Sequence, residues 1–272
     1  MRTSKLIILL FLISSSVWIG ASHQGRCDNG PLIKPFSVTV RAGVAPSLFT
    51  DRGSVNVVVC PFSPPFFEVA KGQKFGDIWH NYAANVGVDF GYALCNNVEL
   101  FGEFNYRRAK ATNKSFLGVA PTGAFGNFFF DLDDFQEYAG YCGFRYFFNR
   151  VICERMAFFL GSKFGLVNYP KIRTRPLTII NATGISLIQD TVWFDAHTAV
   201  SGGLQVGFDY LICDWISLFF NAEIVASGSL KPFFNFVKAD PTIFPNFTNL
   251  LREANGTLLS FPVNIGFRFY FG

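Results

Sequence analysis

The sequence predicts an all-β protein: an eight-stranded antiparallel transmembrane up-and-down β-barrel with short periplasmic turns and long extracellular loops. Hydrophobic residues make up 50% of the chain and include 35 Phe, yet beyond the N-terminal segment no apolar run is long enough for a transmembrane helix. Instead, apolar and polar residues alternate in separate segments, and the chain contains 25 Gly. Barrel strands need this alternation because one face contacts lipid and the other lines the lumen.

The last segment shows the pattern most clearly. In residues 261–271 one face is wholly apolar and largely aromatic, with Phe261, Val263, Ile265, Phe267, Phe269 and Phe271. The other face carries Asn264, Gly266 and Arg268. The closing strand of a membrane barrel must present only apolar side chains to lipid and pair on both edges, and this segment has the composition to do so.

The N-terminus predicts export. Arg2 and Lys5 precede an apolar stretch that ends at the small residues Gly20 and Ala21, which is the organisation of a secretory signal peptide. We therefore expect residues 1–21 to be a signal peptide and residues 22–272 to form one outer-membrane β-barrel domain. An uncleaved anchor helix is the alternative, but the apolar stretch is short for one.

Seven further strands are expected, near 36–45, 82–94, 98–108, 135–148, 156–168, 196–210 and 216–227. In chain order, their apolar faces are represented by Val40, Phe90, Phe104, Phe144, Phe164, Val206 and Phe220. The residues beside these, which point to the opposite face, are Arg41, Asp89, Glu103, Arg145, Lys163, Gln205 and Asn221. Each segment therefore has one face suited to lipid and one suited to a lumen.

The connections between these strands alternate in length. Short turns follow the second, fourth and sixth strands, including the tight turns at Cys95-Asn96-Asn97 and Cys213-Asp214-Trp215. Long loops follow the others, at about 46–81, 109–134, 169–195 and 228–256. Outer-membrane barrels have short turns inside and long loops outside, so both chain ends are expected on the periplasmic side.

A soluble β-barrel such as a lipocalin is the main alternative, because alternation alone cannot tell which face points inward. In a soluble barrel the polar face would be solvated and dense in Lys, Glu and Thr. Here that face is mostly Gly, Ala, Ser and Asn with a few charges. Small residues suit a crowded lumen, which favours the membrane barrel.

We expect the few charged residues of the polar face to form a network that plugs the lumen. The acids are Asp89, Glu99, Glu103, Glu137, Asp209 and Glu223. The bases are Arg41, Arg107, Arg145, Lys163 and Arg268. Near balance of charge suits a closed interior, because an unpaired charge in a narrow space of low dielectric is costly.

The export signal, the eight alternating strands and the Phe-rich final strand together resemble the small outer-membrane barrels of the OmpA, OmpX and opacity-protein type. The segments from Gly87 to Tyr106 and from Gly207 to Glu223 have the same form, a strand, a turn at Asn or Asp, and a second strand. The resemblance covers essentially the whole mature chain and implies the outer membrane of a bacterium. The final Gly272 departs from the usual terminal Phe.

Six cysteines are many for such a barrel. On the predicted topology Cys27, Cys95, Cys153 and Cys213 lie at the periplasmic rim. In an oxidising periplasm they could pair within the barrel or cross-link it to other envelope proteins. A set of unpaired thiols is the alternative.

Enzyme, metal and nucleic-acid functions find little support. The chain has no Gly-x-Ser-x-Gly motif and no Cys-x-x-Cys spacing, and its three His are scattered, so we expect no catalysis, no metal and no cofactor. A net charge of +4 is too small and dispersed to indicate nucleic acid.

We therefore expect a structural, adhesin-like surface-interaction scaffold that displays its extracellular loops. A small porin-like channel for ions or small solutes is the alternative, although an eight-stranded lumen is only wide enough to be filled by side chains. The expected partners are outer-membrane lipid and lipopolysaccharide, other envelope proteins through disulfides, and a host surface through the loops.

Overall fold

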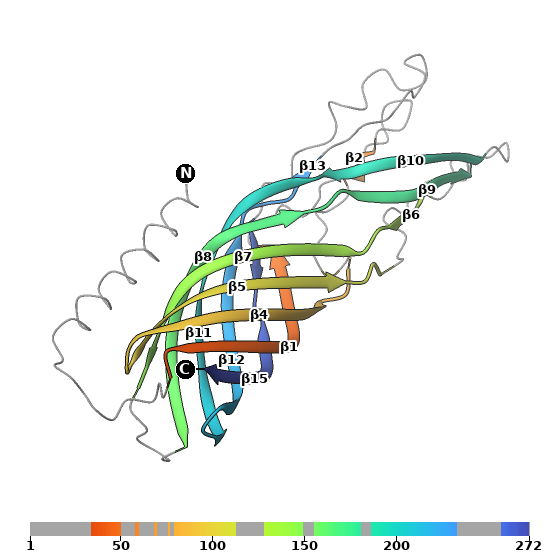
Figure 1. The fold of residues 1–272 in the computed structure, drawn as a ribbon. Coiled ribbons are helices and arrows are strands. Elements are labelled where there is room, and N and C mark those ends of the chain that lie inside the picture. Colours follow the sequence, from red (N-terminus) through yellow and green to blue (C-terminus); the bar gives the residue numbers. More distant parts are fainter. Residues whose placement is uncertain are drawn as a thin grey trace.

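Fifteen strands form in the part of the chain that the computed structural model describes (Figure 1). The described residues are 34–49, 58–59, 68–69, 76, 79–112, 128–148, 155–180, 186–232 and 257–271. The expected signal peptide lies outside these residues, as do Cys27 and Cys153. No helix among the described residues has the length and apolar character needed to cross a bilayer.

Eight long strands make the barrel. They are β1 (Phe36–Phe49), β4 (Tyr82–Cys95), β5 (Val98–Ala109), β7 (Phe135–Phe147), β8 (Met156–Tyr169), β11 (His197–Cys213), β12 (Ile216–Ser227) and β14 (Leu258–Ser260) with β15 (Val263–Phe271). Each pairs antiparallel with both neighbours, and the β11–β12 and β1–β15 ladders complete the ring. The predicted eight-stranded antiparallel barrel is confirmed.

The eighth strand is interrupted at Pro262, which has no backbone N–H to donate to a ladder. The neighbouring backbone groups still pair across the break. The Phe261 N–H donates to the Pro46 carbonyl at 2.8 Å, and the Glu223 N–H donates to the Pro262 carbonyl at 2.8 Å. β14 and β15 are therefore one bent strand, and the barrel stays closed at this point.

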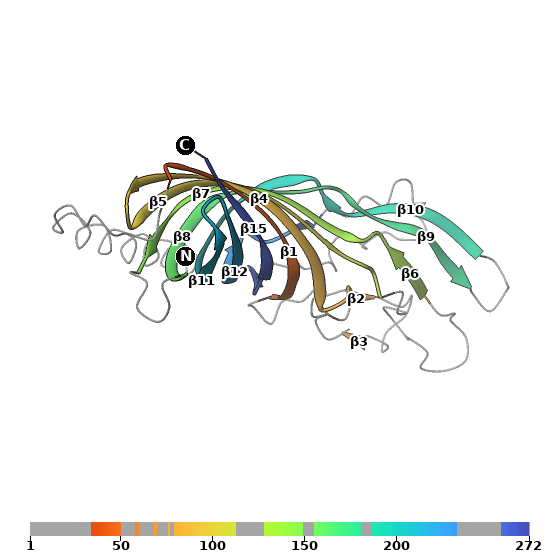
Figure 2. The same cartoon turned by 60° about the horizontal axis from the view of Figure 1, so that its bottom comes forward.

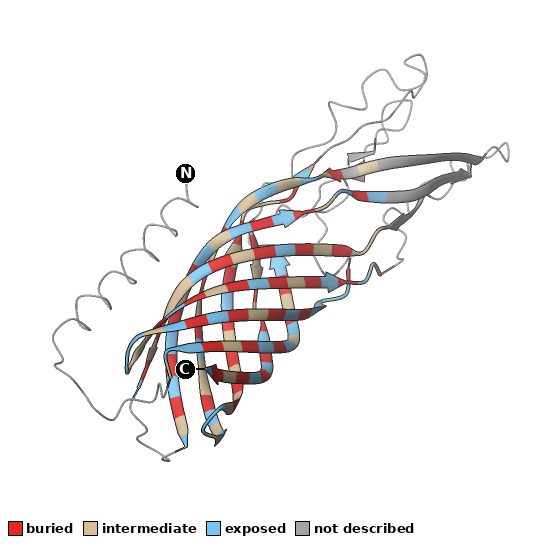
Figure 3. Cartoon of the chain, viewed as in Figure 1, coloured by how far each residue is buried: buried red, intermediate tan, exposed pale blue. Residues whose placement is uncertain are grey.

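Exposure alternates along the barrel strands, as the stripes in Figure 3 show. On β5, for example, Phe104 is 68% exposed, whereas Glu103 and Arg107 are each 1% exposed. The exterior is thus apolar and the interior is polar, the reverse of a soluble protein. Burying apolar surface in water-free lipid is the physical reason for this inversion.

A second sheet extends the barrel at the end with the long connections. It contains β6 (Phe128–Leu132), β9 (Ile172–Ile180), β10 (Ser186–Asp195) and β13 (Lys231–Pro232), in the order β13-β10-β9-β6. β9 and β10 continue the directions of β8 and β11 and project beyond the barrel (Figures 1 and 2). We call these four strands the extracellular sheet. A further short ladder joins β2 (Val58–Val59) and β3 (Glu68–Val69).

The sequence predicts one long loop over 169–195, whereas the structure contains two strands there, β9 and β10. The structure pairs β9 with β10 antiparallel, with two register shifts along the ladder. Pro176 and the polar residues near 181–185 obscure the alternation that would have identified them. The barrel therefore presents ordered β-structure outside the membrane.

Candidate functional site in the lumen

The structure places all eleven charged residues of the expected lumen network on inward faces. They come from all eight barrel strands, and none is more than 4% exposed. Six are acids and five are bases, so the buried set carries one more negative than positive charge. Nine of the eleven are joined by ion pairs into one group, which we call the lumen network.

The first half of the lumen network runs inward from the periplasmic end. Arg268 contacts Asp209 at 2.7 Å and is also paired with Glu99. Arg145 lies 3.2 Å from the other oxygen of Glu99 and 2.5 Å from Asp89. Cations and anions therefore alternate along this half, so that each charge has an opposite charge beside it.

The second half is a closed arrangement around Arg41. Its guanidinium contacts Asp89 at 3.2 Å and is also paired with Glu103 and Glu223. Lys163 bridges the last two residues, at 2.7 Å from Glu103 and 2.5 Å from Glu223. Because all five side chains are within the ring of strands and shielded from water, removing one leaves its partners buried without compensation.

Arg107 and Glu137 form a separate pair nearer the extracellular end. Their closest atoms are 3.3 Å apart, and Arg107 also donates a 2.6 Å hydrogen bond to the hydroxyl of Ser260. No ion pair among the described residues joins these two to the lumen network. The expected set of eleven is therefore divided into a group of nine and a pair.

Aromatic side chains share the lumen with the charges, which the count of apolar and polar residues alone does not indicate. Phe147, Phe159 and Phe219 form an aromatic stack, with both neighbouring ring centroids 5.3 Å apart and each ring at most 2% exposed. The guanidinium of Arg145 lies 3.9 Å from the ring centroid of Phe101 and 5.2 Å from that of Phe219. Rings thus fill the space beside the buried cations and contribute cation–π attraction.

Glycines make room for these rings. A β-carbon added at Gly207 would meet the Phe220 carbonyl oxygen and lie 2.5 Å from Cζ of Phe159.

We therefore expect Gly207→Ala to lower the free energy of unfolding by about 1–3 kcal/mol, as overpacking does. Gly140→Ala is the matched control, because its nearest heavy atom would be 4.0 Å away. Urea unfolding of both refolded variants measures the difference, and equal midpoints would contradict the packing.

An aromatic cap closes the other end of the lumen. It consists of Trp79, Phe135, Tyr169 and Phe194, each at most 2% exposed. The rings of Trp79 and Phe135 are 5.4 Å apart, and those of Phe135 and Tyr169 are 6.0 Å apart. Nε1 of Trp79 donates to the Asp133 carbonyl at 3.0 Å. The cap therefore fixes the base of the extracellular sheet onto the barrel.

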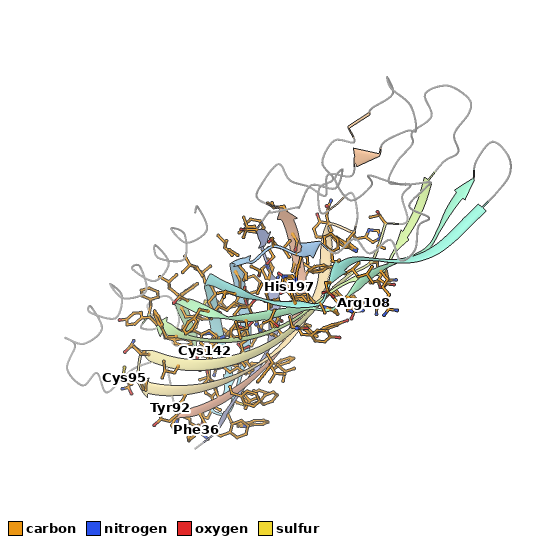
Figure 4. All side chains as sticks on the ribbon, turned by 90° about the horizontal axis from the view of Figure 1, so that it is seen from above. Phe36, Tyr92, Cys95, Arg108, Cys142 and His197 are labelled. Atoms are coloured by element: carbon orange, nitrogen blue, oxygen red, sulfur yellow. The ribbon has the colours of Figure 1, made fainter. Side chains whose placement is uncertain are left out.

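His197 lies beside the cap at the extracellular end (Figure 4). One ring nitrogen, Nε2, is 2.8 Å from the Ser229 carbonyl, and the ring centroid is 5.3 Å from that of Tyr169. These contacts are those of a packed, hydrogen-bonded side chain. The described residues contain no group of three or more His, Cys, Asp or Glu that could hold a metal ion.

Cys95 and Cys213 are free thiols in the structure, at the ends of β4 and β11. These two strands are four positions apart around the ring in either direction, so they lie on opposite sides of the barrel. With neighbouring strands about 4.8 Å apart, the two cannot approach the roughly 7 Å between α-carbons that a disulfide needs. A disulfide between these two cysteines of one chain is therefore excluded by the topology.

We predict that the rim cysteines cross-link the barrel to other envelope proteins. On non-reducing gels, native envelopes should show high-mass species that collapse to monomer with reductant. The double variant Cys95→Ser/Cys213→Ser should lose part of these species, whereas Cys142→Ser on the lipid face should not. A monomer with fully alkylatable thiols, both with and without reductant, would contradict this prediction.

No family model matches the chain, and no curated protein matches it. Among solved structures, neisserial surface protein A is similar at 13% identity and a TM-score of 0.44, over 87% of this chain and 97% of that one. Ail of Yersinia pestis, in complex with the heparin analogue sucrose octasulfate, is similar at 13% identity and a TM-score of 0.37, over 86% and 99%. OprG of Pseudomonas aeruginosa is similar at 12% identity and a TM-score of 0.35, over 87% and 96%.

Similarities this weak do not place the chain in a membrane. The evidence for that placement comes from the chain's own side chains. The outward face is a continuous apolar surface that includes Phe90, Phe104, Phe164 and Phe267. The inward face holds buried, paired charges, and the ring of strands leaves no open edge. Without transmembrane helices, only a closed β-barrel can hydrogen-bond all of its backbone N–H and C=O groups within lipid. The protein is a closed eight-stranded antiparallel β-barrel of the membrane-spanning type.

Proposed function

We propose that this protein is a non-conducting outer-membrane scaffold that presents its extracellular sheet and loops to a partner at the cell surface. The observation that carries the proposal is the filled lumen. Nine buried charges, an aromatic stack and an aromatic cap occupy the interior of the ring. A barrel without a conducting pore acts mainly as a rigid support for its extracellular sheet and loops.

The porin-like alternative requires a water path past the lumen network. The side chains of Arg41, Glu103 and Lys163 are each 0% exposed, as is that of Arg145. Opening a path would separate charges that have no water to replace their partners, which is costly. We therefore expect planar-bilayer recordings of the refolded protein to show no steady conductance. Reproducible single-channel steps would overturn the scaffold proposal.

The extracellular sheet is the part we propose to contact a host surface or another envelope protein. Its two long strands, β9 and β10, can be removed at the Tyr169–His197 pair that joins β8 to β11 at their base, with the loss of Phe194 from the aromatic cap. Replacing residues 172–195 by an Asn-Gly turn should remove both strands and leave the barrel ladders intact. Cells displaying the shortened protein should lose attachment to the surface that full-length protein binds. Unchanged attachment, with normal heat-modifiable migration on gels, would exclude the sheet as the contact.

A further inference from the structure

The charges buried in the lumen do not balance. The eleven charged side chains comprise six acids and five bases, so with every group ionised they would carry one net negative charge. A net charge shut away from water is costly, and a buried acid or base commonly avoids that cost by becoming neutral. One of the six carboxyl groups is therefore expected to hold a proton.

Five of the six acids are well stabilised as anions. Four of them pair with two cations each, and these are Asp89, Glu99, Glu103 and Glu223. Asp209 pairs with Arg268 and accepts hydrogen bonds from the hydroxyls of Ser217, at 3.0 Å, and Tyr270, at 2.9 Å. Opposite charges and hydrogen bonds of this kind favour the ionised form of a carboxyl group.

Glu137 is the exception. Among the described residues it is paired only with Arg107, with closest atoms 3.3 Å apart, and neither of its carboxylate oxygens accepts a hydrogen bond. Its side chain is 0% exposed, so bulk water does not replace the missing donors. As an anion, Glu137 would be the least compensated acid of the lumen.

The groups around Glu137 offer no further compensation. The titratable residues that face this part of the lumen, from β1, β5, β8, β11, β12 and its own strand, are Arg41, Glu103, Arg107, Tyr141, Lys163, Tyr169, His197 and Glu223. The Tyr141 hydroxyl is bonded to Ser201 at 3.0 Å, and the Tyr169 hydroxyl donates to the Gly228 carbonyl at 3.4 Å. Arg41 and Lys163 pair with acids of the lumen network.

Asp134 shows the opposite case, outside the lumen and just before β7. Burial raises its pKa, but the Ala111 N–H, which donates to it at 3.0 Å, and the Arg108 guanidinium, at 2.7 Å, more than offset this and lower the pKa. The Arg108 side chain is 53% exposed, so this is a surface pair. A carboxyl group with such donors stays ionised, and Glu137 accepts no hydrogen bond of this kind.

We propose that Glu137 is a buried proton site, protonated at neutral pH, and that its ionisation at alkaline pH loosens the aromatic cap. With the proton in place, five charged acids remain against five bases, and the buried set is neutral. Phe135, two residues before Glu137 on the inward face of β7, is a member of the cap. An anion at Glu137 would lie beneath these rings, and the water that it needs would have to displace them.

The first test is urea unfolding of refolded residues 22–272 in detergent micelles as a function of pH. A free Glu is ionised above about pH 5.5, so unfolding releases the Glu137 proton. From about pH 5.5 to about pH 8, this release alone raises the unfolding equilibrium constant about tenfold per pH unit. Glu137→Gln has the shape of the protonated carboxyl and no proton to lose. It should therefore remove this contribution from the pH dependence and unfold at a higher urea concentration than wild type near the upper end of the range.

Glu103→Gln is the matched control, because Glu103 is also 1% exposed or less but pairs with Arg41 and Lys163. It should lower the urea midpoint at every pH and leave the pH dependence unchanged. Midpoints of wild type in NaCl, KCl and choline chloride at one ionic strength should agree. A midpoint that depends on Na⁺ or K⁺ would mean that a metal ion balances the charge and would overturn the proposal. Failure of Glu137→Gln to fold, or a wild-type pH dependence in this variant, would also overturn it.

The second test follows the cap through the fluorescence of Trp79, which is 0% exposed. The background Trp193→Phe/Trp215→Phe leaves it as the only tryptophan in residues 22–272. Its emission should shift to the red as the pH rises from about 8 to about 10, where Glu137 loses its proton. Glu137→Gln in the same background should not show this shift. Equal shifts in both proteins, or a shift in neither, would contradict a switch beneath the cap.

Discussion

Replacing Arg145 by Ala is expected to lower the free energy of unfolding by about 3–5 kcal/mol, the cost of leaving buried partners unpaired. Arg145 is 0% exposed and pairs with Asp89 and Glu99, and its guanidinium covers the Phe101 ring. The eleven buried lumen charges already include one more acid than base. Removing Arg145 therefore increases the net negative charge of the lumen. Urea unfolding in detergent micelles, followed by tryptophan fluorescence, measures the change.

Two further variants make the result interpretable. Arg145→Met keeps most of the side-chain volume, so a similar loss of stability would assign the cost to the missing charge. Arg108→Ala breaks an exposed pair and should cost no more than about 1 kcal/mol, as surface pairs do. If Arg145→Ala unfolds at the wild-type urea concentration, the lumen is wet, and the channel alternative gains support.

The strands could be predicted from sequence because lipid imposes one rule along each of them. In β15, every second side chain from Val263 to Phe271 is apolar, since any polar group there would face hydrocarbon. The same rule assigns Arg268 to the inside. It does not say which acid each base meets, because pairing depends on the stagger of eight strands around the ring. Only the structure supplies Asp209 and Glu99 as its partners.

The inward aromatic residues are hard to predict because most apolar side chains on a barrel strand face lipid. Phe147 lies between Tyr146 and Phe148, which share the outer face with Phe144 in the period-two alternation, so its own position points inward. Phe101 stands in the same relation to Leu100. Trp79 was harder to place, since it precedes β4 in a region without alternation. Its burial depends on Phe135 and Phe194, which are distant in sequence.

Replacing Phe267 by Arg is expected to destabilise the barrel by about 2–4 kcal/mol, the cost of a charge near the bilayer midplane. Phe267 is 49% exposed on the outer face and lies in the middle of β15. We expect the variant to refold poorly into lipid vesicles, with a large loss of the heat-modifiable form on gels. Unfolding of the fraction that does insert, measured against urea, gives the magnitude.

Trp215→Arg is the control that separates a membrane barrel from a soluble one. Trp215 is 57% exposed in the short turn between β11 and β12, at the periplasmic interface, where an Arg costs only about 0–1 kcal/mol. If water surrounded the barrel, the new Arg would be solvated at either position, and both substitutions would lower the free energy of unfolding only slightly. A large loss at Phe267 with a small loss at Trp215 therefore requires hydrocarbon around the middle of the barrel, whereas equal small losses would mean that water surrounds it.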